Sequence, residues 1–195
     1  MVANIIDKSV LFLIQQGAIE NTEEQKEIYR YGMELQIYYI IHAAILISLG
    51  LLFGHGLEVA LLLLFFGAIQ VNAGGYHAKT HARCLTIMTI GVILFLLLLP
   101  IYQNNFILQL VSTILGTATV IIMSPVTHKN HPLSPQKSEV LGKRAKFIAV
   151  VLALLWYVLM FFDVSVRLQN IIPVVMAFTF VSLVCAWTSK KICKS

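Results

Sequence analysis

The sequence predicts an all-α, polytopic membrane protein with six transmembrane helices. Its 195 residues have a mean hydropathy of +0.84, and 58% of them are hydrophobic while only 12% are charged. Charged residues make up about a quarter of a typical soluble domain, so a soluble core could not bury this chain's apolar side chains. The apolar residues also gather into six runs that lack the alternation of β-strands. These runs therefore predict helices that cross a membrane.

Two helical patterns come before the apolar runs. Six apolar residues recur at helical spacing, with Asp7 and Lys8 on the other side, and predict an amphipathic helix that lies in the membrane interface. They are Val2, Ile5, Ile6, Val10, Leu13 and Ile14. Further on, Thr22 and Gln25 have the spacing of a capping box, which predicts that a charged helix begins there.

The six apolar runs follow in order along the rest of the chain. They cover residues 37–53, 57–71, 85–101, 106–123, 147–162 and 171–187. A helix that spans the membrane fully needs about 17 to 25 residues, and several of the runs are no longer than this minimum. Flanking residues must extend them or the bilayer must thin locally, and whether the second run spans fully stays open. Gly-His-Gly at 54–56 and residues 103–105 predict tight links.

The Lys and Arg residues predict the orientation of these helices. If the N-terminus is cytoplasmic, Arg167 is the only one of the 14 Lys and Arg residues in the outside links. This distribution matches the rule that positive charge is retained inside. Both termini then face the cytoplasm, and the net charge of +5 reflects membrane topology. We therefore expect no nucleic-acid partner.

The polar stretch between the second and third runs, NAGGYHAKTHARCLT, carries the candidate chemistry. Cys84 comes directly before the third run, so the start of a helix, Lys79 and Arg83 all favour its nucleophilic thiolate form. His77 and His81 are candidate bases. In one continuous helix His81 lies at i,i+3 from Cys84, whereas His77 lies about 10 Å away along the axis. His77 reaches Cys84 only if the chain bends.

Gly74 and Gly75 provide the conformational freedom for such a bend. Two other interpretations stay open. A helical His pair can chelate zinc, but Cys84 could not join the same ion in a straight helix, and three ligands would need a fourth. The stretch could also be a polar loop whose histidines meet lipid headgroups. Three cysteines without CxxC spacing do not support a disulfide framework, and we predict neither a metal nor a cofactor.

The element GGYHAKTHARC resembles the accessory gene regulator protein B family, the membrane cysteine endopeptidases that mature cyclic-peptide pheromones in Gram-positive bacteria. YGME at 31–34 and SPVTHKNHPL at 124–133 are also similar to that family, and the resemblance covers nearly the whole chain. It implies that His77 is the catalytic base and Cys84 the nucleophile. His81 falls at a variable position and becomes a secondary candidate. Gln70 departs from the family pattern, in which a cation is common near that point.

The resemblance implies a two-stage acyl transfer in quorum sensing. Cys84 attacks a backbone carbonyl of a precursor peptide while His77 moves the proton, so that the C-terminal tail leaves and a thioester remains. A thiol or hydroxyl of the precursor then attacks the thioester and closes a thiolactone or lactone ring. A site at the membrane boundary would keep water out.

Further residues are candidates for support and substrate binding. Glu34, Asn72 and Asn130 could orient His77, and Glu34 is favoured because an unpaired carboxylate beside the first span is costly. Backbone N–H groups at the start of the third helix could stabilise an oxyanion. Four residues are candidates to bind substrate: Lys79, Arg83, Lys129 and Asn130.

The basic stretch at 124–146 follows the fourth run. Its three prolines oppose a regular helix, and its Lys and Arg residues suit anionic lipids. The family's acidic precursor tails would suit the same charges. We therefore expect a precursor peptide and membrane lipids as partners, and short spans favour a homodimer.

The sequence thus predicts one membrane-embedded peptidase domain over residues 1–195. Interfacial and cytoplasmic helices occupy 1–36, the six-helix region 37–189 and a basic tail 190–195. The protein is expected in the cell membrane of a Gram-positive bacterium, with its active site on the cytoplasmic side. A small peptide transporter or exporter is the alternative, but the runs lack the paired midplane interruptions of transporters.

Overall fold

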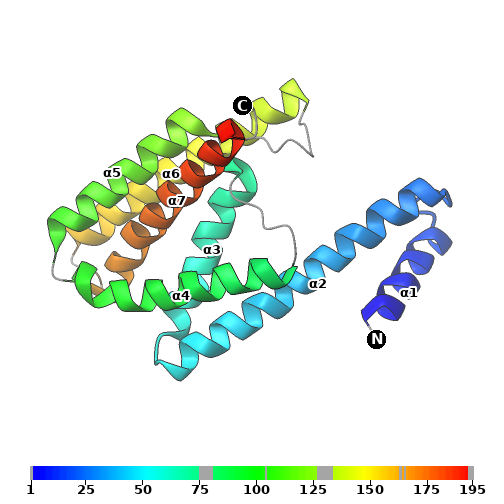
Figure 1. Ribbon diagram of the computed structural model, residues 1–195, viewed down its shortest axis with the longest axis horizontal. Coiled ribbons are helices and arrows are strands. Elements are labelled where there is room, and N and C mark those ends of the chain that lie inside the picture. Colours follow the sequence, from blue (N-terminus) through cyan, green and yellow to red (C-terminus); the bar gives the residue numbers. More distant parts are fainter. Residues whose placement is uncertain are drawn as a thin grey trace. The chain divides into compact units, whose positions relative to one another are not determined.

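The computed structural model describes residues 2–74, 81–103, 105–126, 134–162, 164 and 166–192, and every regular element in these ranges is an α-helix. In chain order these helices are α1 Val2–Gln15, α2 Glu23–Leu52, α3 Gly56–Ala73, α4 His81–Gln103, α5 Phe106–Met123, α6 Pro135–Phe161 and α7 Val166–Ile192 (Figure 1). By length and composition, α2 to α7 could each cross a membrane. The predicted all-α fold with six spans is confirmed.

The chain forms two compact units, Met1–Leu46 and Ile47–Ser195. In the first unit, α1 packs against the beginning of α2, and Thr22 caps α2 by accepting a hydrogen bond from the Gln25 N–H at 3.3 Å. The Gln25 side chain accepts from the Glu20 N–H at 3.0 Å, instead of from Thr22 as in a full capping box. The predicted helix start is confirmed, but the backbone N–H that donates to the Gln25 side chain belongs to Glu20 and not to Thr22.

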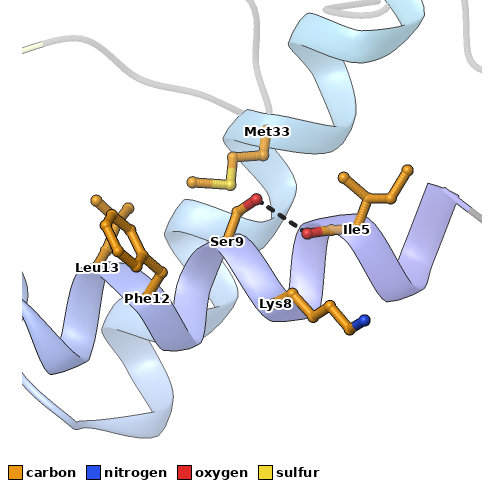
Figure 2. Close-up of a pocket in the computed structure, with 6 residues that line it drawn as sticks. All are labelled: Ile5, Lys8, Ser9, Phe12, Leu13 and Met33. Carbon is orange, nitrogen blue, oxygen red and sulfur yellow. Dashed lines mark hydrogen bonds between the residues drawn. The ribbon is translucent and has the colours of Figure 1, made fainter.

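The apolar face predicted for α1 is divided between two surroundings. Ile6 and Val10 are buried against Ile19 and pack with Met33 of α2, so they do not face a membrane. Ile5 and Phe12 remain more than half exposed. Together with other side chains they line a groove of about 350 Å³ (Figure 2). The lining consists of Ile5, Lys8, Ser9, Phe12, Leu13 and Met33.

The predicted runs at 57–71, 85–101 and 171–187 lie within longer helices, and α5 coincides with the run at 106–123. The runs at 37–53 and 147–162 each end one residue beyond α2 and α6, respectively. The helices α2 to α7 have 18 to 30 residues, so short spans no longer favour a homodimer, which stays a prediction. The prolines do not keep the whole stretch at 124–146 out of helical structure. Pro135 is the first residue of α6, where the missing N–H costs nothing, and Ser134 caps the helix by accepting from the Lys137 N–H at 3.3 Å.

The last helix, α7, is the centre of the second unit. It contacts α3, α4, α5 and α6, and Figure 1 shows it running beside α5 and α6. Its residues Ile171, Val174 and Met176 are completely buried. A Cβ on Gly116 of α5 would lie only 2.5 Å from the carbonyl oxygen of Met176. Glycine therefore permits the close crossing of α5 and α7.

We expect Gly116→Ala to lower the free energy of unfolding by about 1–3 kcal/mol, as overpacking of a core does. The obstructing Met176 oxygen belongs to the backbone, so α7 itself would have to move. The thermal unfolding midpoint in detergent micelles measures the effect. Gly67→Ala is the matched control, because nothing lies within 4 Å of its Cβ position and alanine favours a helix. Equal midpoints for the two variants would contradict the close crossing.

Polar contacts tie the helices together at one end of the second unit. Glu58, near the start of α3, is buried, and its Oε1 lies 3.2 Å from His55 Nδ1 and 3.8 Å from an Arg167 guanidinium nitrogen at the start of α7. Gln109 of α5 donates to Asn170 Oδ1 of α7 at 2.9 Å. These partners offset the cost of burying a carboxylate and an amide. We call this the Glu58 end.

Backbone contacts join other helix ends at the opposite end of the unit. The Val126 N–H, just after α5, donates to the carbonyl oxygen of Ala73 at the end of α3 at 2.8 Å. Gly142, in the second turn of α6, lies against Pro125. The end of α3, the end of α5 and the beginning of α6 therefore meet. We call this the Ala73 end.

Candidate functional site

The candidate nucleophile Cys84 lies on the packed face of α4. The buried residues Val92, Phe95, Leu99 and Tyr102 define that face, and Cys84 lies on it because it precedes Val92 by eight residues, slightly more than two helical turns. Its side chain is accordingly partly buried. The thiol is therefore only partly open to solvent.

The helix begins earlier than the apolar run. Since α4 starts at His81, Cys84 lies inside the first turn instead of directly before the helix. The first N–H groups of a helix lack partners within it, and the helix dipole is positive there. His81 is at i,i+3 from Cys84 in this helix, and Arg83 is exposed. That such N–H groups act on the Cys84 sulfur stays a prediction.

Several predicted site residues lie outside the described residues. They are Gly75, His77, Lys79, Lys129 and Asn130, and the side chain of His81 is also outside them. Their assignment as base, support or substrate contacts stays a prediction. Glu34 belongs to α2 in the first unit and is partly buried. Its relation to Cys84, which lies in the second unit, likewise stays a prediction.

Gly74 ends α3 with a backbone conformation that favours glycine. Its φ is +74° and its ψ is −179°, a region from which residues with a Cβ are nearly excluded. The Gly74 N–H donates to the Gln70 carbonyl oxygen at 3.0 Å. The chain therefore turns away from the α3 axis at the first of the two glycines that precede His77.

Two polar side chains lie close to this turn on α3. Asn72 donates from Nδ2 to the Ala68 carbonyl oxygen at 2.8 Å, so this hydrogen bond occupies its amide within its own helix. Gln70 Nε2 is buried, and no residue in the described part of the chain accepts from it. Gln70, which departs from the family pattern, thus has a buried side-chain donor beside the turn.

Sequence reasoning missed the contact between residues 124–126 and the end of α3. The predicted role of this segment was limited to a family motif and a basic loop, whereas Val126 donates a hydrogen bond to Ala73. Because the two residues are far apart in the sequence, no local spacing pattern could have predicted this contact. The glycine at position 74 is the one local signal that could have indicated it, because glycine permits a close approach of backbones.

The described residues do not test the zinc interpretation. Among them no group of three His, Cys, Asp or Glu side chains could hold a metal ion, but His77 is not included. Neither Cys84 nor Cys185 forms a disulfide in the described part of the chain, and Cys185 is exposed on α7. Cys193 lies outside the described residues.

Comparison with known proteins gives consistent results. A family model described as accessory gene regulator B matches residues 3–189. The chain is 27% identical over 155 residues to accessory gene regulator protein B of Staphylococcus intermedius, and 26% identical over 160 residues to the protein of that name from Staphylococcus aureus (strain bovine RF122 / ET3-1). Each match covers 80% of both chains. No solved structure matches significantly.

Proposed function

Since the chain belongs to the accessory gene regulator B family, we propose that it is a membrane cysteine endopeptidase that matures a quorum-sensing precursor peptide. The observation that carries this proposal is the position of Cys84, which is partly buried in the first turn of α4 with helix N–H groups beside it. The positive end of a helix dipole favours the thiolate that a base generates there, and the thiolate is the nucleophilic form. The six apolar helices make the chain a multi-pass membrane protein.

In the first stage, the Cys84 sulfur bonds to a backbone carbonyl carbon of the precursor while His77 takes the thiol proton. Free N–H groups in the first turn of α4 stabilise the oxyanion. The peptide C–N bond then breaks, His77 gives its proton to the departing amine, and the C-terminal tail leaves. The N-terminal part of the precursor stays on Cys84 as a thioester.

In the second stage, a thiol or hydroxyl within the same precursor attacks the thioester carbonyl. The new bond closes a thiolactone or lactone ring, and Cys84 leaves as a thiol with the proton of the attacking group. When the attacking group is a thiol, the acyl group passes from one sulfur to another and stays activated. Water would hydrolyse the thioester before the ring closes, so the ring forms only if water is excluded. The partial burial of Cys84 on the packed face of α4 supports such exclusion.

The distribution of charge supports a cytoplasmic site. Lys137, Lys143 and Arg144 lie in the first turns of α6 at the Ala73 end, whereas Arg167 lies at the Glu58 end. Positive charge is retained on the cytoplasmic side, so the Ala73 end would face the cytoplasm, and with it Cys84, which follows Gly74 by only ten residues. Lys143 pairs with Glu139 at 2.6 Å. The remaining cations of α6, with Lys79, Arg83, Lys129 and Asn130, are candidates to hold an acidic precursor tail and lipid headgroups.

The test is to trap the acyl-enzyme. We expect the protein in lipid vesicles, mixed with a precursor peptide and quenched in acid, to gain the mass of the N-terminal fragment on Cys84. Hydroxylamine should remove this mass, because it cleaves thioesters. Cys185→Ser should still form the adduct, and Cys84→Ala should not. Tail release by Cys84→Ala would contradict the proposal, and transport of uncleaved peptide across the vesicle membrane would favour an exporter.

A further inference from the structure

We propose that residues 124–126 form a clamp that positions the catalytic base. By fixing the end of α3, the clamp sets the point from which the chain leaves that helix toward His77. This inference rests on the proposed function, and it assigns a role to Pro125 and Val126 in holding the active-site geometry. The residues of the clamp are positioning residues, because none of them reacts with the substrate.

The first part of the clamp is a hydrogen bond between backbones. The last carbonyl groups of a helix have no partners within it, and at the end of α3 the Val126 N–H supplies one for Ala73 at 2.8 Å. Ala73 is fully buried. The segment itself is held to α5, since Ser124 donates to the Val120 carbonyl oxygen from its N–H at 3.1 Å and from Oγ at 2.6 Å.

The second part is a close fit against two glycines. A Cβ on Gly74 would overlap the Val126 carbonyl oxygen, and a Cβ on Gly142 of α6 would lie 2.9 Å from Pro125 Cδ. Neither neighbour can give way easily, because one is backbone and the other belongs to a proline ring. The segment is therefore enclosed by the end of α3 on one side and by α6 on the other.

The clamp lies next to the proposed catalytic residues in the sequence. Gly74 precedes His77 by three residues and Cys84 by ten. A shift of α3 relative to α4 would therefore move the start of the connection that carries the base with respect to the sulfur. Proton transfer needs a donor and acceptor within hydrogen-bond reach, and a misplacement of about 1 Å can cost about a hundredfold in rate.

Gly142→Ala tests the clamp, because it pushes on Pro125 from α6 without touching the proposed catalytic residues. The probe is alkylation of Cys84 by iodoacetamide as a function of pH, in vesicles and in a Cys185→Ser, Cys193→Ser background. We expect the Gly142→Ala profile to shift toward that of His77→Ala. We also expect kcat for tail release to fall about tenfold or more with little change in KM. Gly67→Ala, whose Cβ position is open, should match the wild type.

The other outcomes separate a failure of the proposed base from a failure of the clamp. If His77→Ala leaves the alkylation profile unchanged, the assignment of the base fails, and the clamp fails with it. If His77→Ala changes the profile but Gly142→Ala only lowers the unfolding midpoint, the clamp is merely structural and this inference is overturned. Should Gly142→Ala not insert, Gly74→Ala is measured in the same way. Failure of both variants to fold would also overturn the inference.

Discussion

Replacing Cys84 with alanine should abolish release of the C-terminal tail from the precursor peptide. Without the sulfur no acyl-enzyme forms, and loss of a covalent nucleophile lowers kcat by at least about a thousandfold. Mass spectrometry of the released tail, with purified protein in vesicles, measures the rate. The fold should tolerate the change, because Cys84 is only partly buried in the first turn of α4.

Cys185 provides the control for this experiment. It is the other cysteine in the described part of the chain, it forms no disulfide there, and it is exposed on α7. Cys185→Ser should therefore release the tail at the wild-type rate, with the same unfolding midpoint within error. Cys84→Ser should release much less tail, because a serine hydroxyl is far less ionised than a thiol. More than a tenth of the wild-type rate in Cys84→Ala would remove Cys84 from the mechanism.

Hydropathy predicted which segments cross the membrane better than it predicted where helices begin. The run at 106–123 coincides with α5, because polar links flank it on both sides. By contrast, α2 begins at Glu23 and α6 at Pro135, well before their apolar runs. Polar residues continue a helix into the aqueous phase without contributing hydropathy. Capping residues are the better signal, since Thr22 and Ser134 both accept from the N–H three residues later.

The interfacial helix shows a different limit of sequence patterns. The spacing of Ile6 and Val10 correctly indicated a one-sided apolar face, but the same pattern fits burial in a membrane or against another helix. In the structure Ile19 and Met33 cover that face. The exposed Phe12, which interrupts the pattern, belongs to the surface left open. A helical period therefore predicted the face but not its partner.

The candidate site was predictable only where its chemistry is local. Cys84 beside the start of a helix follows from residue type and spacing. The contact of Val126 with Ala73 and that of Glu58 with Arg167 join segments distant in the sequence, and these depend on how whole helices pack. His55, by contrast, lies only three residues from Glu58 and meets it at 3.2 Å. A pair at this spacing could have been predicted.

His77→Ala and His81→Ala should separate the two candidate bases. We expect His77→Ala to lower kcat for tail release by about 10²- to 10⁴-fold, the usual contribution of a general base, and His81→Ala to stay within about threefold of wild type. Added imidazole should partly restore the His77→Ala rate, because a small base can occupy the space left by the missing ring. The same vesicle assay and the unfolding midpoints of both variants provide the measurement.

If His81→Ala lost activity and His77→Ala did not, the proposed geometry of the site would change. His81 belongs to the first turn of α4, at i,i+3 from Cys84, so a base at this position would need no bend between α3 and α4. In that case the positive φ of Gly74 and its contact with Val126 would serve only the packing of the Ala73 end. Loss of activity in His77→Ala alone requires the chain to fold back toward the sulfur. The turn at Gly74 begins such a path.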